Sequence, residues 1–142
     1  MQLTRREFAG VATCAICAAS GLAPSSASAQ TASGTATQGL TRKILSQMDG
    51  PMPGYVTIVA EVEIEASVLV ARHTHPGIES GYVVEGGIDL PIEGQPVRSL
   101  KPGDGFQVPA LTPHAGAKNG DQKTKIVSTY VVEKGKPLAS PA

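Results

Sequence analysis

Polar and apolar residues alternate along most of the chain from about residue 41 to residue 133, and a period of two is typical of β-strands that bury one face. The longest alternating run is Tyr55–Ile64. Shorter runs rich in Val, Ile and Leu are separated by turn residues and cover 68–73, 81–87, 88–92, 96–100, 106–109 and 125–133. A helix is an option only over 42–47. Short strands without crossover helices predict an all-β fold, built as an antiparallel sandwich or barrel.

The first 29 residues follow a different pattern, which is typical of an export signal. The pair Arg5 and Arg6 precedes an uncharged run over 8–19, and an A-x-A cleavage pattern ends at Ala29. We therefore expect residues 1–29 to be a signal peptide of the twin-arginine (Tat) type, with the general secretory route as the alternative. The apolar run is shorter than the roughly 20 residues that span a bilayer, so we expect no stable membrane anchor and a periplasmic or secreted protein.

The rest of the chain divides into three segments. We expect a flexible N-terminal leader over 30–48, a single barrel over 49–134 and an irregular tail over 135–142. The leader is predicted from the small and polar residues that open the mature chain. Both cysteines, Cys14 and Cys17, lie in the signal, so the mature protein should contain neither a disulfide nor a thiolate ligand.

Composition narrows the choice of partner. The chain has 142 residues, which is enough for one domain, and its 12 Lys and Arg balance its 12 Asp and Glu. A nucleic-acid partner requires a clustered basic surface, so this balance argues against one. There are no Trp, two Phe and three Tyr, which leaves few side chains for stacking on flat cofactors. We expect the partner to be a small-molecule substrate or ligand.

All three histidines fall in two short segments, with His73 and His75 in one and His114 in the other. Side chains two positions apart on a strand share a face, so His73 and His75 should continue an inward row begun by Leu69 and Ala71. A lone barrel histidine is more often a core or surface residue than a ligand. Neutral imidazole is, however, a good ligand for divalent transition metals, and the clustering of every histidine favours a metal site.

Two turns can bring further ligands to the same centre. Glu79 follows a Pro76-Gly77 turn that can return its carboxylate toward the histidine pair. His114 follows Pro113 at the end of a stiff turn that can present it from another strand. Three imidazoles and one carboxylate suit one divalent transition metal, such as Mn, Fe, Ni, Cu or Zn, and the sequence does not choose among them.

These segments carry a family resemblance. His73-Thr74-His75-Pro76-Gly77-Ile78-Glu79, followed by Gly86, resembles the first motif of the cupin superfamily, H-x-H-x(3,4)-E-x(6)-G. The stretch from Gly103 through Pro109 to His114 resembles the second cupin motif. At three turn positions the chain departs from these motifs, with Ser67 and Leu111 where the family usually has Gly and Lys118 where it has Asn.

The resemblance covers most of residues 50–132 and implies both a fold and a site. The implied fold is a small jelly-roll-like antiparallel β-barrel. The implied metal ligands are His73, His75, Glu79 and His114. The resemblance also implies a homodimer that forms through edge strands, and Tyr55–Ile64 is the candidate edge strand.

Cupins with this ligand set resemble dioxygenases such as quercetinases, and oxalate-processing enzymes. The first hypothesis is therefore a metal-dependent, dioxygenase-like oxidoreductase acting on a small organic molecule. In that enzyme Glu79 could loosen from the metal and act as a catalytic base. Two alternatives stay open: a non-catalytic periplasmic metal- or ligand-binding module, which a scarcity of polar residues inside the barrel would favour, and a cupin isomerase or lyase.

Overall fold

The computed structural model describes residues 37–116 and 121–142, and these residues form strands and turns without a helix. Within these ranges, therefore, no helix is long and apolar enough to cross a membrane. The all-β prediction is confirmed. The strands are β1 (Leu40–Asp49), β2 (Tyr55–Ile64), β3 (Val70–Thr74), β4 (Gly77–Glu85), β5 (Ile88–Leu90), β6 (Arg98–Leu100), β7 (Gly105–Val108), β8 (His114–Gly116), β9 (Thr124–Glu133) and β10 (Ser140–Pro141).

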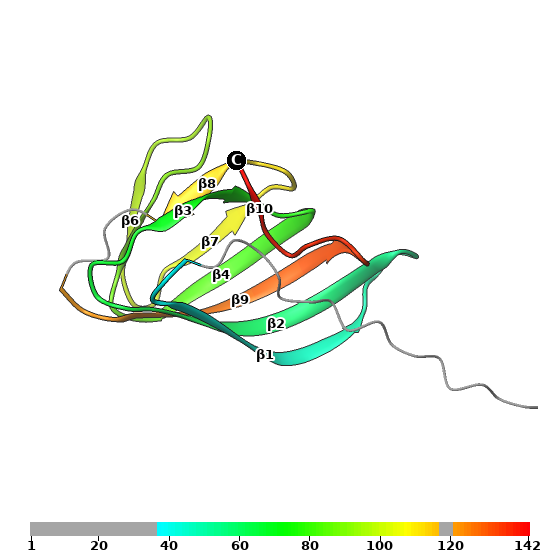
Figure 1. The fold of residues 1–142 in the computed structure, drawn as a ribbon, viewed down its shortest axis with the longest axis horizontal. Coiled ribbons are helices and arrows are strands. Elements are labelled where there is room, and N and C mark those ends of the chain that lie inside the picture. The colour runs from blue at the N-terminus through cyan, green and yellow to red at the C-terminus, as the bar shows by residue number, and fades with distance from the viewer. Residues whose placement is uncertain (1–36, 117–120) are drawn as a thin grey trace, which may run out of the picture.

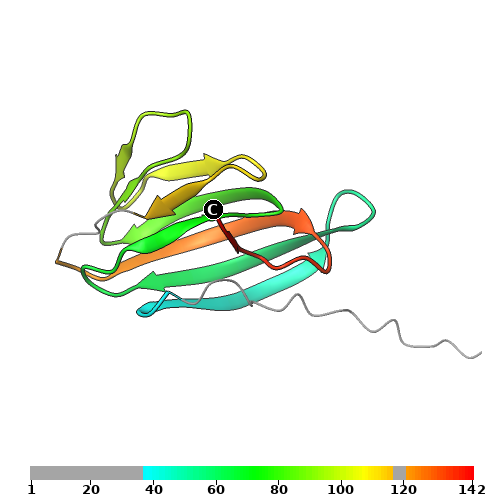
Figure 2. The same ribbon diagram turned by 45° about the horizontal axis from the view of Figure 1, so that its top comes forward.

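Antiparallel pairing organises the strands into one large sheet and two small ones. The large sheet has the order β1-β2-β9-β4-β7, and the small sheets have the orders β10-β3-β8 and β5-β6. In Figures 1 and 2 the long strands lie side by side, and β3 and β8 face them from the other layer. The space between these two layers is where the histidines and Glu79 meet.

Alternation along the long strands separates a buried face from a solvent-facing one. Every second residue of β2 and of β9 is buried, and the intervening residues are partly exposed. The buried side chains form two clusters, one around Val62, Ile126 and Leu90 and the other around Ile58, Tyr130 and Leu138. Each fully buried aliphatic side chain contributes about 1.5–3 kcal/mol, so this inner face supplies the main stabilisation of the fold.

The segment predicted as a flexible leader contains a strand. β1 begins at Leu40 and runs beside β2, from the pair Leu40–Ile64 to the pair Asp49–Val56. The helix option over 42–47 is therefore wrong. β1 is an edge strand with mostly exposed residues, so its sequence lacks the alternation that marks the inner strands. The predicted signal peptide, residues 1–29, lies outside the described residues.

Two further predictions about the ends of the barrel need correction. The tail over 135–142 was expected to be irregular, but β10 pairs with β3, and Leu138 and Ala139 just before it are buried. Tyr55–Ile64 was expected to be an edge strand, but β2 is hydrogen-bonded to β1 on one side and to β9 on the other. The long edge that two copies could use is therefore β1.

β3 does not keep the strict alternation that the sequence suggests. Its pairing with β8 joins Val70 to Gly116 and His73 to His114, with a register shift between these two pairs. A bulge adds one residue to the strand and changes which side chains face inward. Val70 therefore packs against the core, whereas Leu69 and Ala71, both predicted to point inward, are exposed, Leu69 by 63%.

Candidate metal centre

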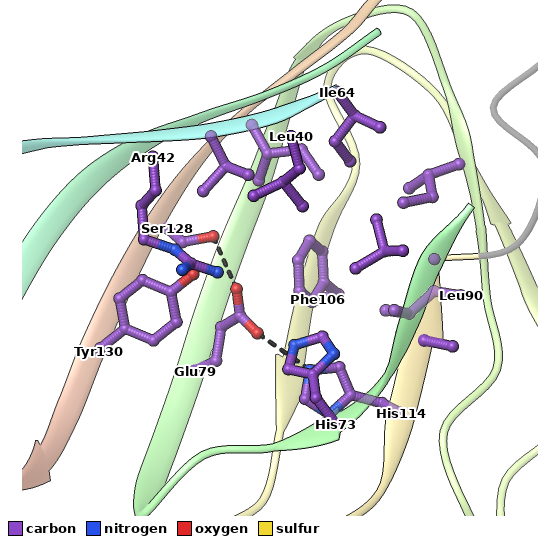
Figure 3. A pocket seen from close by; sticks show the side chains of 16 residues that line it. Leu40, Arg42, Ile64, His73, Glu79, Leu90, Phe106, His114, Ser128 and Tyr130 are labelled. Carbon is purple, nitrogen blue, oxygen red and sulfur yellow. Dashed lines mark hydrogen bonds and ion pairs between the residues drawn. The ribbon is translucent and has the colours of Figure 1, made fainter. Parts of the chain in front are cut away.

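The structure brings together the four residues that the sequence singled out. His73 lies on β3, His75 immediately follows that strand, Glu79 lies on β4 and His114 opens β8. One ring nitrogen from each of the three histidines lies within 4.8 Å of the others. His75, Glu79 and His114 are buried, and His73 is partly buried. Figure 3 shows His73 and His114 beside the Glu79 carboxylate.

Backbone carbonyl groups hold each imidazole in one orientation. The Nδ1 atoms lie 2.7 Å from the Ala71 oxygen for His73, 2.5 Å from the Leu138 oxygen for His75 and 3.0 Å from the Thr112 oxygen for His114. A carbonyl oxygen only accepts, so each Nδ1 carries the hydrogen and donates it. In a neutral ring the other nitrogen, Nε2, then presents a lone pair. This is the arrangement in which metal-binding histidines are usually held.

The Nε2 atoms of His75 and His114 are buried and have no hydrogen-bond partner. They point at the Glu79 carboxylate, whose Oε2 lies 3.1 Å from the first and 3.4 Å from the second. Lone pairs on two nitrogens and on a carboxylate repel one another unless a cation or a proton lies between them. The donor set therefore fits a divalent transition metal, which accepts imidazole nitrogen and carboxylate oxygen together.

Glu79 is held as an anion. Burial alone raises the pKa of its carboxyl group. When the Nε2 atoms of His114 and His75 carry protons in the metal-free protein, their hydrogen bonds and charges outweigh burial and keep the pKa well below its usual range. The second oxygen, Oε1, accepts a hydrogen bond of 2.8 Å from the Ser128 hydroxyl. This bond fixes the plane of the carboxylate and leaves Oε2 directed at the histidines.

His73 is neutral over the ordinary pH range. Burial and the neighbouring His114 lower its pKa from 6.5 to about 4, although its hydrogen bond with Ala71 opposes the shift. A neutral imidazole is the form that binds a metal, so His73 itself needs no deprotonation at neutral pH before it can accept one.

A cavity with a volume of about 50 Å³ opens beside these residues. His73, Glu79 and His114 form one part of its wall. Three polar side chains that the sequence analysis did not assign to the site, Arg42, Ser128 and Tyr130, also line it. The remaining lining is mostly apolar, with Val62, Ile64, Ile88, Leu90, Phe106 and Ile126 among its members.

The sequence pattern could have placed two of these three residues inside the barrel, but not the third. Ser128 and Tyr130 share the parity of the buried Ile126 and Val132 on β9, so alternation alone could have placed them inside the barrel. Arg42 fell in the predicted leader, where no inward face was expected. These side chains correct the expectation that the barrel interior offers few polar residues beyond the ligands.

Tyr130 is a buried polar group of the cavity wall. Its side chain is buried, and its ring centroid lies 5.0 Å from that of His75. Burial first, and then the charge of Glu79, raise the pKa of its hydroxyl group. The phenol therefore stays protonated and keeps a hydrogen that it can donate inside the site.

Comparison with known proteins gives a family for this chain. The family model described as "Cupin domain" matches residues 60–130. No curated protein matches the chain.

Several solved structures share the fold at low sequence identity. DMSP lyase DddQ from Ruegeria pomeroyi DSS-3 is 21% identical with a TM-score of 0.59 over 68% of this chain and 49% of that one, so this chain spans about half the length of that protein. KdgF from Halomonas sp. is 26% identical with a TM-score of 0.53 over 65% and 80%. An RmlC-like cupin from Shewanella frigidimarina NCIMB 400 is 21% identical with a TM-score of 0.57 over 68% and 79%. The family match over half the chain and these likenesses of fold agree with the histidine and glutamate motifs, and the chain belongs to the cupin family.

Proposed function

We propose that this protein is a metal-dependent enzyme that binds one divalent transition metal on His73, His75, Glu79 and His114 and acts on a small organic molecule. The observation that carries the proposal is the pair of buried, unpartnered Nε2 atoms of His75 and His114 aimed at one carboxylate oxygen. A buried polar atom without a partner is costly, and a metal ion would satisfy both nitrogens at once. The adjoining cavity would give a substrate access to that ion.

The first reaction class is oxygenation, which makes the protein a dioxygenase-like oxidoreductase. A redox metal in this site would supply electron exchange with O2 and polarise substrate oxygens. The protein's own part is positional: carbonyl groups hold the imidazoles, Ser128 holds Glu79, and apolar walls limit water in the cavity. Glu79 is the residue that could take a substrate proton if its carboxylate loosened, because it is an anion at neutral pH.

Proton-transfer chemistry, as in a lyase or an isomerase, is the second candidate. Tyr130 favours it, because a protonated phenol and an ionised carboxylate line the same cavity and could serve as acid and base. One protein of similar fold, DddQ, is described as a DMSP lyase. At 21% identity that likeness supports the fold, so Tyr130 carries this candidate alone.

We also propose that the protein is exported to the periplasm or secreted. The support is the sequence of the first 29 residues, with the Arg5-Arg6 pair and the small residues before Gln30. Export of a folded chain through the twin-arginine route would allow the metal to be inserted in the cytoplasm. A precursor trapped in the cytoplasm should then already contain metal, and a metal-free precursor would contradict this order of events.

An oxygen-consumption screen separates the two reaction classes. The protein is loaded with Fe(II), Mn(II), Ni(II), Cu(II) or Zn(II) in turn and incubated with small organic acids and phenols, while O2 and product are both followed. Substrate-dependent O2 uptake that is lost in His114→Ala supports oxygenation. Turnover without O2 uptake that is lost in Tyr130→Phe supports the lyase or isomerase reading. Metal binding without turnover of any compound would favour the non-catalytic module.

A further inference from the structure

Arg42 places a positive charge in the cavity from the strand at the sheet's edge. It lies on β1, paired with Val62, and its side chain lines the same cavity as Glu79 and Tyr130. Figure 3 shows the guanidinium group beside Ser128 and Tyr130, on the side of Glu79 away from His73. The guanidinium carbon lies 5.9 Å from the centroid of the Tyr130 ring.

No acidic partner holds this charge in the described part of the chain. The Nε atom of Arg42 is buried without a hydrogen-bond partner, and no carboxylate there forms an ion pair with the guanidinium group. A guanidinium group is always protonated and has five donor hydrogens in a planar fork. The Tyr130 ring stabilises it only in part, because a cation–π contact supplies no acceptor for those hydrogens.

The charges around the cavity are not balanced once a metal is bound, and a bound anion would balance them. Glu79 is directed at the histidines and at Ser128, so its two oxygens are already engaged. A divalent metal at the histidines would add two positive charges to a region whose only anion among the described lining residues is Glu79. Arg42 and such a metal would then lie on two sides of one small cavity without a compensating negative charge.

We propose that Arg42 is the substrate-binding residue of this cavity and holds the carboxylate group of a small organic acid. This inference rests on the proposed function, since it names the substrate class of the same site. A carboxylate matches the guanidinium fork, and two parallel hydrogen bonds fix its orientation. The apolar walls would surround the hydrocarbon part of the acid, while Arg42 determines which end of the molecule enters first.

The size of the cavity sets the size of the acid. A volume of about 50 Å³ accommodates roughly four water-sized groups, since one such group needs about 10–15 Å³. A second hollow of about 20 Å³ shares Leu40, Arg42, Val70 and His73 with the first. The ligand is therefore a short-chain acid of a few heavy atoms, and propionate is a suitable probe.

The test compares propionate with propionamide, which has the same shape and no charge. Dissociation constants are measured by ligand-observed NMR on metal-free and zinc-loaded protein. Charge-assisted hydrogen bonds contribute about 1.5–3 kcal/mol, so propionate should bind at least about tenfold more tightly than propionamide. Arg42→Gln should remove this preference in both forms of the protein and leave the binding of zinc unchanged.

The matched control is Arg72→Gln, the same change at an exposed arginine that pairs with Glu93 and does not line the cavity. It should leave the preference for propionate intact. Arg42→Lys keeps the charge without the fork and should weaken propionate binding severalfold. Propionate binding that is equal in wild type and Arg42→Gln would overturn the inference, because the carboxylate would then be held elsewhere. Failure of wild-type protein to bind zinc would contradict the proposed metal site instead.

Discussion

His75 Nδ1 lies 2.5 Å from the carbonyl oxygen of Leu138, although 63 residues separate the two in the chain. The C-terminal segment therefore orients the imidazole of His75, which the first cupin motif supplies and which we propose as a metal ligand. Leu138 is only 1% exposed, and its side chain packs in the same cluster as Ile58 and Tyr130. Packing of this one side chain thus fixes the carbonyl group on which the tautomer of His75 depends.

Leu138→Ala should therefore affect both stability and metal affinity. Removing a fully buried leucine side chain costs about 2–5 kcal/mol of unfolding free energy. Displacement of the carbonyl should also weaken zinc binding by about tenfold or more, as loss of groups that orient metal ligands usually does. Urea unfolding and zinc titration measure the two effects. Leu69→Ala, at a leucine that is 63% exposed, should change neither, and equal effects of the two variants would contradict this account.

Ser128→Ala should lower metal affinity with little loss of stability. The substitution removes the 2.8 Å hydrogen bond to Glu79 Oε1, so the carboxylate would rotate more freely. We expect zinc affinity to fall by about ten- to a hundredfold. The matched control is Ser80→Ala, because Ser80 lies next to Glu79 on β4 and its side chain contacts Gln107 on the other face. An unchanged affinity in Ser128→Ala would mean that Glu79 is not held through this bond.

Leu111→Gly should stabilise the protein. Leu111 has a φ of 57°, in the left-handed region, and its N–H donates to the His75 carbonyl at 2.9 Å. A non-glycine residue pays about 1 kcal/mol or more for this conformation. The side chain is 66% exposed, so its removal loses little packing. We expect Leu111→Gly to exceed Leu111→Ala in unfolding free energy by about 0.5–1 kcal/mol in urea titrations. A less stable glycine variant would show that the left-handed conformation carries no strain here.

The metal-free protein should lose stability as the pH falls from about 6.5 to about 4. The pKa of His73 drops on folding from 6.5 to about 4, so in this window the unfolded chain binds more protons than the folded one. The contribution of His73 to the free energy of unfolding is complete above pH 6.5 and is lost as the pH approaches 4. The lowered pKa of Glu79 acts in the same direction at still lower pH.

Urea unfolding of chelator-treated protein at several pH values between 4 and 7 measures this loss. His73→Gln has no titrating imidazole at this position and should show a shallower dependence. A wild-type stability that stays flat over the window, or a variant as steep as wild type, would contradict the assignment to His73.

The sequence predicts the strands of this fold well and singles out the four residues that the structure brings together, because both depend on local patterns. Tyr55–Ile64 alternates without interruption and forms β2 with the predicted bounds. The spacing of His73, His75 and Glu79 reflects one strand, one turn and the next strand. Ser67 and Leu111, which occupy positions where cupins usually have glycine, keep the positive φ that glycine would favour.

What the sequence does not predict depends on contacts between distant segments. The edge strand β1 is mostly exposed and shows no regular alternation of buried and exposed positions. Only its pairing with β2 shows that Arg42 faces inward. The bulge in β3 reverses the expected direction of Leu69 and follows from pairing with β8. The bond between His75 and Leu138 joins residues whose proximity no local pattern encodes.

The central claim is that one metal ion is held by the Nε2 atoms of His73, His75 and His114 and by the carboxylate of Glu79. Elemental analysis of the protein purified from its native compartment, beside a His75→Ala variant shown to be folded by circular dichroism, tests it most directly. We predict about one equivalent of a divalent transition metal in the wild-type protein and a small fraction of that in the variant. Wild-type protein that is metal-free and does not take up added metal, or a folded His75→Ala variant that keeps a full equivalent, would contradict the claim.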